Sequence, residues 1–279
     1  MSDYIKSVNA HYGSVDIASR ILEQLTEAGK DIDALTRDDL TAFDEFHGGG
    51  RASTRALAQF AGLSRNASVL DVGSGIGGPA RTLAAEFGCR VTGIDLTEEF
   101  CRAAEMLTAR LGMSDVVSFH HGNAVDMPFA DESFDVVWSQ NTLMNIEHKD
   151  ALFSQVRRVL KPGGFFAFET LLAGRAGALH FPVFWASSPK LNHLVTIEDM
   201  QTLLSRAGLV KVAWEDMTKQ IIHAGRKRLA AFEREGPPPL GLGVIVPQDV
   251  TVKMRNSLKN TEEGRTVAVQ AIYARRTTS

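Results

Sequence analysis

The chain has 279 residues, of which 44% are hydrophobic, and a formal net charge of -3 at pH 7 with a pI near 6.2. This length fits one α/β domain with appendages, and the charge balance argues against nucleic acid or an anionic membrane as the main partner. Cys89 and Cys101 form neither a disulfide framework nor a metal pattern, and no stretch reaches the ~20 apolar residues of a membrane span. We therefore expect a soluble, metal-free cytoplasmic protein.

The first segment, residues 1–60, is predicted to be mostly helical. Ile17, Ile21 and Leu25 recur at the spacing of one helical face. A polar, glycine-rich turn at 43–51 then leads into the next helix. We expect this segment to form a helical lid, separate from a main domain at 61–279.

From residue 68 onward, short apolar strands alternate with helices. Strands are predicted at 68–72, 90–94, 116–120, 134–139, 164–169, 209–214 and 266–274, and helices at 78–87, 98–111, 151–160 and 197–208. Strand–helix alternation implies a parallel sheet with helices on both faces, and near-continuous apolar strands suit a sheet covered on both sides. The prediction is an α/β, doubly wound fold.

Between the last two predicted strands lies a long insertion, at about 218–262. It holds helical runs at 223–233 and 250–260, separated by a proline–glycine cluster at 237–243 that indicates a loop. Such an insertion is a natural second lid.

A glycine-dense turn follows the first predicted strand, which ends at Asp71. Gly73, Ser74 and Gly75 open this turn, and its glycines can adopt positive φ and let a ligand approach the backbone closely. A nucleotide-phosphate loop and an ordinary strand-to-helix connection would both fit the turn alone.

Polar residues also follow the other strands, where the carboxyl ends of a parallel sheet form a binding edge. Asp95 and Leu96 follow the second strand about 20 residues after the turn, at the place where an acid accepts hydrogen bonds from ribose hydroxyls. Asn123 and Ala124 follow the third strand, where an amide can contact an adenine edge. Gln140 follows the fourth strand, and a 160–164 turn precedes the fifth.

Together these residues resemble a class I S-adenosylmethionine-dependent methyltransferase of the small-molecule type, similar to sarcosine/dimethylglycine N-methyltransferases and to quinone and tocopherol C-methyltransferases. Residues 69–75 resemble the family's first motif, Asp95 its ribose acid, Asn123-Ala124 its adenine contact and 160–164 its characteristic turn. The resemblance implies a seven-stranded, mostly parallel Rossmann-like sheet ending in an antiparallel hairpin, and S-adenosyl-L-methionine as the cofactor.

Two other classes of function stay open. The Gly-x-Gly pattern at Gly73 and Gly75 also suits an NAD-dependent oxidoreductase, although Asp71 before the loop would repel a pyrophosphate and Asn123 has no role in that scheme. The chain could also be a methyltransferase-like binding protein that has lost turnover.

The acceptor is expected to be a small molecule, because the chain lacks both the Asn/Asp-Pro-Pro-aromatic tetrad and the Pro-Cys nucleophile of DNA methyltransferases. We expect N-methylation of an amine or amino acid; C- or O-methylation of a quinone, phenol or other natural product is the alternative. A homo-oligomer is left open.

Tyr12 and His47 are the candidate catalytic residues. The alternatives are that Tyr12 caps the core and that His47 has a structural role. Asn141 and Phe184 are candidate substrate contacts. The alternatives are that Asn141 caps the next helix and that Phe184 packs under the lid. Lys149 is expected to face solvent.

Overall fold

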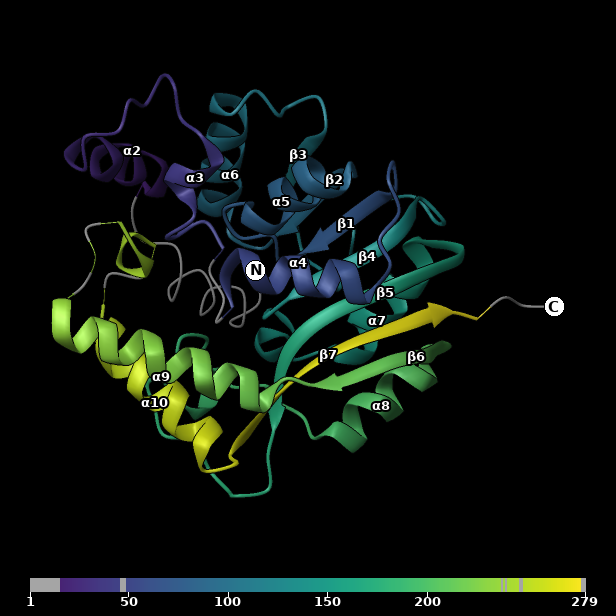
Figure 1. Cartoon of the computed structure of the whole chain (residues 1–279). Helices are drawn as coiled ribbons and strands as arrows, with labels where there is room; N and C mark the ends of the chain where they lie inside the picture. The colour runs from purple at the N-terminus through teal and green to yellow at the C-terminus, as the bar shows by residue number, and fades with distance from the viewer. Residues whose placement is uncertain (1–15, 46–48, 237, 239, 246–247, 277–279) are drawn as a thin grey trace.

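The computed structural model describes residues 16–45, 49–236, 238, 240–245 and 248–276. Its centre is a seven-stranded sheet of order β3-β2-β1-β4-β5-β7-β6 (Figure 1). The strands are β1 (Ser68–Val72), β2 (Arg90–Asp95), β3 (Val117–His121), β4 (Phe134–Gln140), β5 (Leu160–Ala173), β6 (Leu209–Asp216) and β7 (Thr266–Arg275). The pairs from β3 to β5 are parallel, whereas β7 runs antiparallel to both β5 and β6. The predicted mixed sheet with its C-terminal hairpin is confirmed.

Helices precede and connect these strands. They are α2 (Ile17–Glu27), α3 (Arg37–Leu40), α4 (Gly50–Phe60), α5 (Gly78–Phe87), α6 (Glu98–Arg110), α7 (Lys149–Val159), α8 (Ile197–Arg206), α9 (Thr218–Glu235) and α10 (Val250–Glu262), with 3₁₀ turns η1 (Leu143–Asn145), η2 (Pro189–Leu191) and η3 (Leu242–Val244). The fifth strand begins earlier than predicted, because Leu160 already pairs with Phe134 before an irregularity in the register.

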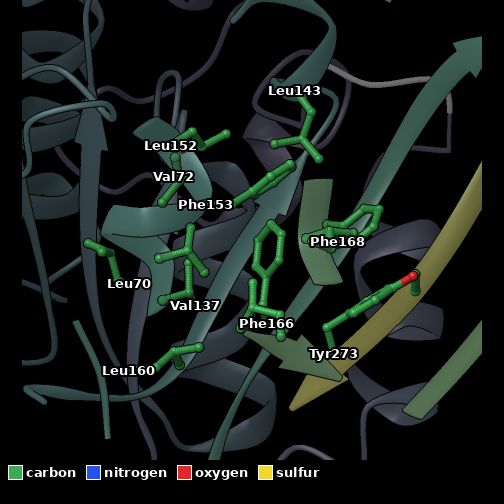
Figure 2. Packing of buried hydrophobic residues seen from close by; sticks show 14 of the residues in the cluster. Leu70, Val72, Val137, Leu143, Leu152, Phe153, Leu160, Phe166, Phe168 and Tyr273 are labelled. Carbon is green, nitrogen blue, oxygen red and sulfur yellow. The ribbon is translucent and has the colours of Figure 1, made fainter. Parts of the chain in front are cut away.

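Alternating side chains of the central strands enter two cores, one on each face of the sheet. Val69 of β1 packs with α4 and α5 on one face, while Leu70 packs with α7 on the other. Figure 2 shows this second core, in which Phe168 and Tyr273 stack with ring centroids 6.1 Å apart. Burial on both faces is what a doubly wound sheet requires, and it explains the near-continuous apolar runs of the central strands.

The strand order reverses between β1 and β4, so the connections leaving these two strands diverge at the carboxyl edge of the sheet. Such a switch point leaves a crevice in which ligands of open α/β sheets bind. The fold therefore places the turns after β1, β2, β4 and β5 around one crevice.

Two sets of helices flank this edge. Helices α9 and α10 lie side by side at the lower left of Figure 1 and both contact β7. Helix α2 packs on α6 and reaches η3, where Arg20 Nε donates a hydrogen bond of 2.9 Å to the carbonyl oxygen of Val244. The N-terminal helices and the late insertion thus contact each other, although their boundaries as lids stay predictions.

Candidate active site

A cavity of about 450 Å³ lies at the carboxyl ends of the central strands. Most of the residues proposed from sequence line it: Gly73, Ser74, Gly75, Asp95, Leu96, Asn123, Ala124, Gln140, Asn141 and Phe184. Helices α9 and α10 supply part of the opposite wall, through residues such as Ile221 and Met254. One cavity therefore joins the sheet edge to the late insertion.

The glycine turn after β1 can form only with residues that lack a side chain. Gly73 has φ +75°, and a Cβ there would lie 2.0 Å from the hydroxyl oxygen of Thr142. Gly77 has φ +85°, and a Cβ there would lie 2.4 Å from the ring of Phe119. Both the backbone conformation and the lack of space select glycine at these positions.

The amides of this turn point into the protein. Gly73 and Ser74 donate to the carbonyl oxygen of Ile94 at 2.8 and 3.2 Å, and Gly77 donates to that of Ser74 at 2.9 Å. The Gly75 amide donates to Asp95 Oδ2 at 2.9 Å. A pyrophosphate site needs such N–H groups directed at the ligand, so this turn is not arranged as one.

Asp95 ends β2 beside the turn. Its second oxygen, Oδ1, accepts the Thr97 amide at 2.9 Å, so both carboxylate oxygens are held in place. Burial raises the pKa of Asp95, and the two amide hydrogen bonds oppose that rise. Each oxygen can accept a further hydrogen bond, which suits the two hydroxyls of a ribose.

Asp71 lies elsewhere. Its side chain is buried in the sheet, where Asp71 is in register with Gly93 of β2 and Trp138 of β4, and it is not part of the cavity wall. The structure places Asp71 below the turn, where its carboxylate can support the turn only indirectly.

The ends of β4 and β5 bring together a second group of polar side chains. Gln140 Oε1 accepts the indole N–H of Trp138 at 3.0 Å and lies 2.9 Å from the hydroxyl oxygen of Thr54 on α4. Asn141 has φ +52° and donates from Nδ2 to Glu169 at 3.1 Å. The cap of α7 is His148, so Asn141 does not cap that helix.

A buried acid–base cluster connects the segment before α4 to α5, and sequence reasoning missed it. Arg81 is buried beside Asp44 at 3.3 Å, and it also donates to the Ile76 carbonyl oxygen at 2.9 Å. Burial raises the pKa of Asp44, and the positive charge of Arg81 opposes this rise. Burial also lowers the pKa of Arg81. Neighbouring Glu45 accepts the hydroxyl of Thr82 at 2.6 Å. Asp44 lines the cavity, so this cluster fixes part of its wall.

Glu169 is a further cavity residue that the sequence did not single out. It lies on β5 opposite Gln140, the last residue of β4, is 3% exposed, and lines the cavity beside Asn141. The local signal in the sequence is an acid at the end of the apolar run 164–169, and Asp95 ends the run of β2 in the same way.

An aromatic wall follows β5. Phe184 and Trp185 line the cavity, and Trp185 Nε1 donates to Asn192 at 2.9 Å. Asn260 on α10 holds this segment in place, because its side-chain amide accepts the His180 N–H at 2.8 Å and donates to the His180 carbonyl oxygen at 3.0 Å.

The charged groups that the structure shows in the cavity wall are mostly acidic. The acidic groups are Asp44, Asp95, Glu147 and Glu169. The basic side chains in this wall are the guanidinium of Arg228 on α9 and the imidazole of His148. Burial lowers the pKa of Arg228. An acidic wall of low dielectric favours cationic ligands.

Tyr12 and His47, the candidate catalytic residues, lie outside the described residues, so their roles stay predictions. The expectation for Lys149 is wrong. Its side chain is buried, and its ammonium donates at 2.6 Å to the carbonyl oxygens of both Ile146 and His193. These two bonds hold the loop after β4 against the segment that follows η2.

Across the described ranges, no three His, Cys, Asp or Glu side chains gather closely enough to hold a metal ion. None of the helices in that part of the chain combines the length and apolar character needed to cross a bilayer.

Residues 70–168 match the family described as "Methyltransferase domain". Among curated proteins, the chain is similar to a glycine/sarcosine/dimethylglycine N-methyltransferase of Actinopolyspora halophila, with 29% identity over 80% of this chain and 40% of the relative. The chain thus spans about two fifths of the length of that relative.

Solved structures show the same fold over the whole chain. Geranyl diphosphate C-methyltransferase from Streptomyces coelicolor A3(2), in complex with S-adenosyl-L-homocysteine, aligns with a TM-score of 0.72, 17% identity and 99% coverage of both chains. The [4+2]-cyclase SpnF aligns with a TM-score of 0.65 and 19% identity, over 99% of this chain and 97% of that one. Residues 70–168 thus match a methyltransferase domain, and these solved structures share the fold of the chain.

Proposed function

We propose that this protein is an S-adenosylmethionine-dependent methyltransferase that acts on a small-molecule acceptor. The observation that carries the proposal is the inward direction of the turn amides together with Asp95 at the cavity wall. A turn whose N–H groups are already bonded, with a carboxylate beside it, disfavours a dinucleotide pyrophosphate and suits an uncharged ribose.

The residues present fit this cofactor. Asp95 would accept the ribose hydroxyls, Asn123 and Ala124 would contact the adenine, and the Gly73–Gly75 backbone would lie against the methionine portion. Asp44, at the cavity wall beside the start of α5, would face the cofactor's ammonium group. When bound, the cofactor supplies an electrophilic methyl group on a sulfonium.

The chain's own contribution to the reaction is then mainly to position the acceptor. Methyl transfer is an in-line displacement, for which alignment of the reacting atoms supplies much of the rate. Gln140 and Asn141 are fixed by hydrogen bonds at the end of β4. The aromatic wall and helices α9 and α10 would exclude water from the opposite side.

We propose N-methylation of an amine as the reaction. The acidic cavity wall supports it, because the acceptor nitrogen gains positive charge during transfer. C-methylation is the second candidate. The apolar side chains of Phe184, Ile221 and Met254 favour it, and the solved neighbour that methylates geranyl diphosphate is a C-methyltransferase.

The two unpaired, buried cysteines suit a reducing compartment, and we propose a cytoplasmic location on that ground.

Calorimetry with two ligands tests the cofactor assignment. We expect S-adenosylhomocysteine to bind with micromolar affinity and NAD to give no heat of binding. Tight binding of NAD without binding of S-adenosylhomocysteine would favour the oxidoreductase alternative. Release of S-adenosylhomocysteine in a screen of amines, amino acids, phenols and quinones would then distinguish an active transferase from a binding protein without turnover.

A further inference from the structure

Glu169 occupies a distinctive place on the binding edge. It lies on β5 in register with Gln140, the last residue of β4, two strands from the glycine turn of β1 and three strands from Asp95 on β2. At a spacing of about 4.8 Å between neighbouring strands, Glu169 lies roughly 14 Å across the sheet from Asp95. The two carboxylates therefore serve different parts of the cavity, and Glu169 belongs to the half beyond the proposed cofactor site.

Three neutral donors in the described part of the chain hold the Glu169 carboxylate. Asn141 Nδ2 donates to Oε1 at 3.1 Å, Gln270 Nε2 on β7 donates to Oε2 at 2.7 Å, and the Ser53 hydroxyl on α4 donates to Oε2 as well. Such amide and hydroxyl donors orient the two carboxylate oxygens. Donors from α4, from β7 and from the residue after β4 thus hold this acid in one orientation at the cavity wall.

The aromatic wall lies in the same cavity. The faces of aromatic rings attract cations, and rings combined with a carboxylate are a recurring means of recognising substituted ammonium groups. Phe184 and Trp185 follow β5 in sequence, and the hydrogen bond from Trp185 to Asn192 restrains the indole.

We propose that Glu169, Phe184 and Trp185 form the part of the site that receives the positive charge of the methylated acceptor, and that the acceptor is an apolar amine. This inference rests on the proposed function. As the amine lone pair forms the new N–C bond, the C–S bond of the donor breaks and its electron pair stays on sulfur. The nitrogen becomes a cation that the Glu169 carboxylate faces, and where it carries a hydrogen, the proton is lost to water after the product leaves.

A pair of probes that differ only in charge tests this proposal. Benzyltrimethylammonium imitates a methylated apolar amine, and neopentylbenzene is its neutral carbon isostere. Both are titrated into the full chain that is saturated with S-adenosylhomocysteine. We expect the ammonium to bind at least tenfold more tightly than the isostere.

Two variants assign that preference to Glu169. In Glu169→Gln the preference should fall at least tenfold, while the Kd for S-adenosylhomocysteine stays within twofold. Glu215→Gln removes a carboxylate from an exposed position outside the cavity wall and should retain the preference. If Glu169→Gln does not fold, Glu169→Asp, which withdraws the carboxylate by one methylene, should lower the preference at least threefold.

Equal binding of the two probes by the wild-type protein would overturn the inference, as would a preference that survives in the folded Glu169 variant. Neither result would affect the cofactor assignment. By contrast, a wild-type protein that does not bind S-adenosylhomocysteine would refute the proposed function itself.

Discussion

Truncation of Asp95 is the most direct perturbation of the proposed cofactor site. In Asp95→Ala the cavity loses the carboxylate that would accept the ribose hydroxyls, and the Gly75 and Thr97 amides lose their acceptor. Hydrogen bonds to charged groups contribute about 1.5–3 kcal/mol each. Water can enter the truncated site and restore part of the loss, so we expect a net weakening of about 1.5–3 kcal/mol, or roughly 10- to 150-fold in Kd.

The assay is a calorimetric titration with S-adenosylhomocysteine, with unfolding measured in parallel. Burial raises the pKa of Asp95, which means that its ionised form is costly in the folded state. Removal of the carboxylate is therefore not expected to unfold the protein. Asp115→Ala removes an acid from an exposed position outside the cavity and serves as the matched control. A Kd for Asp95→Ala within threefold of wild type would refute the assigned binding mode.

Three further predictions concern stability, each measured by denaturant unfolding. Gly73→Ala should cost about 1–3 kcal/mol, because φ is +75° and the new Cβ would lie 2.0 Å from a threonine hydroxyl; Gly163→Ala, at φ +78° with open space around it, isolates the backbone effect and should cost less. Arg81→Met should cost about 3–5 kcal/mol by leaving the Asp44 carboxylate buried and unpaired; additive losses in Arg81→Met/Asp44→Asn would contradict this coupling. Burial lowers the pKa of Lys149 from 10.5 to about 8, so the folded state binds this proton less tightly than the unfolded state does. Its contribution to stability is present above pH 10.5 and is lost as the pH falls through about 8; relative to Lys149→Met, the wild type should thus lose about 3 kcal/mol over that interval, and parallel pH profiles would refute the prediction.

Much of the fold could be predicted from sequence because it depends on local periodicity. The apolar runs around Leu70 and Val137 belong to central strands buried on both faces, and such strands leave a clear pattern. The positions after each strand were also predictable, because parallel strands bring their carboxyl ends to one edge. For that reason Gly73, Asp95 and Asn123, which are separated in sequence, line one cavity.

Residues whose surroundings come from distant segments could not be placed in this way. Lys149 follows a polar loop and reads as a surface residue, yet two carbonyl groups from separate segments bury its ammonium. Asp71 shares the glycine motif but is buried in the sheet, because β2 and β4, which come from later parts of the chain, flank β1 on both sides.

The sequence alone determined the order of strands and helices, the glycine turn and the acid at the end of β2, since each is encoded within one strand–helix unit. Only the tertiary structure decided what lies opposite that turn. Glu169 receives donors from α4, from β7 and from Asn141 after β4, and Arg20 reaches Val244 across 224 residues. Contacts of this kind depend on sheet order and helix packing, which leave no periodic signal in either partner's own segment.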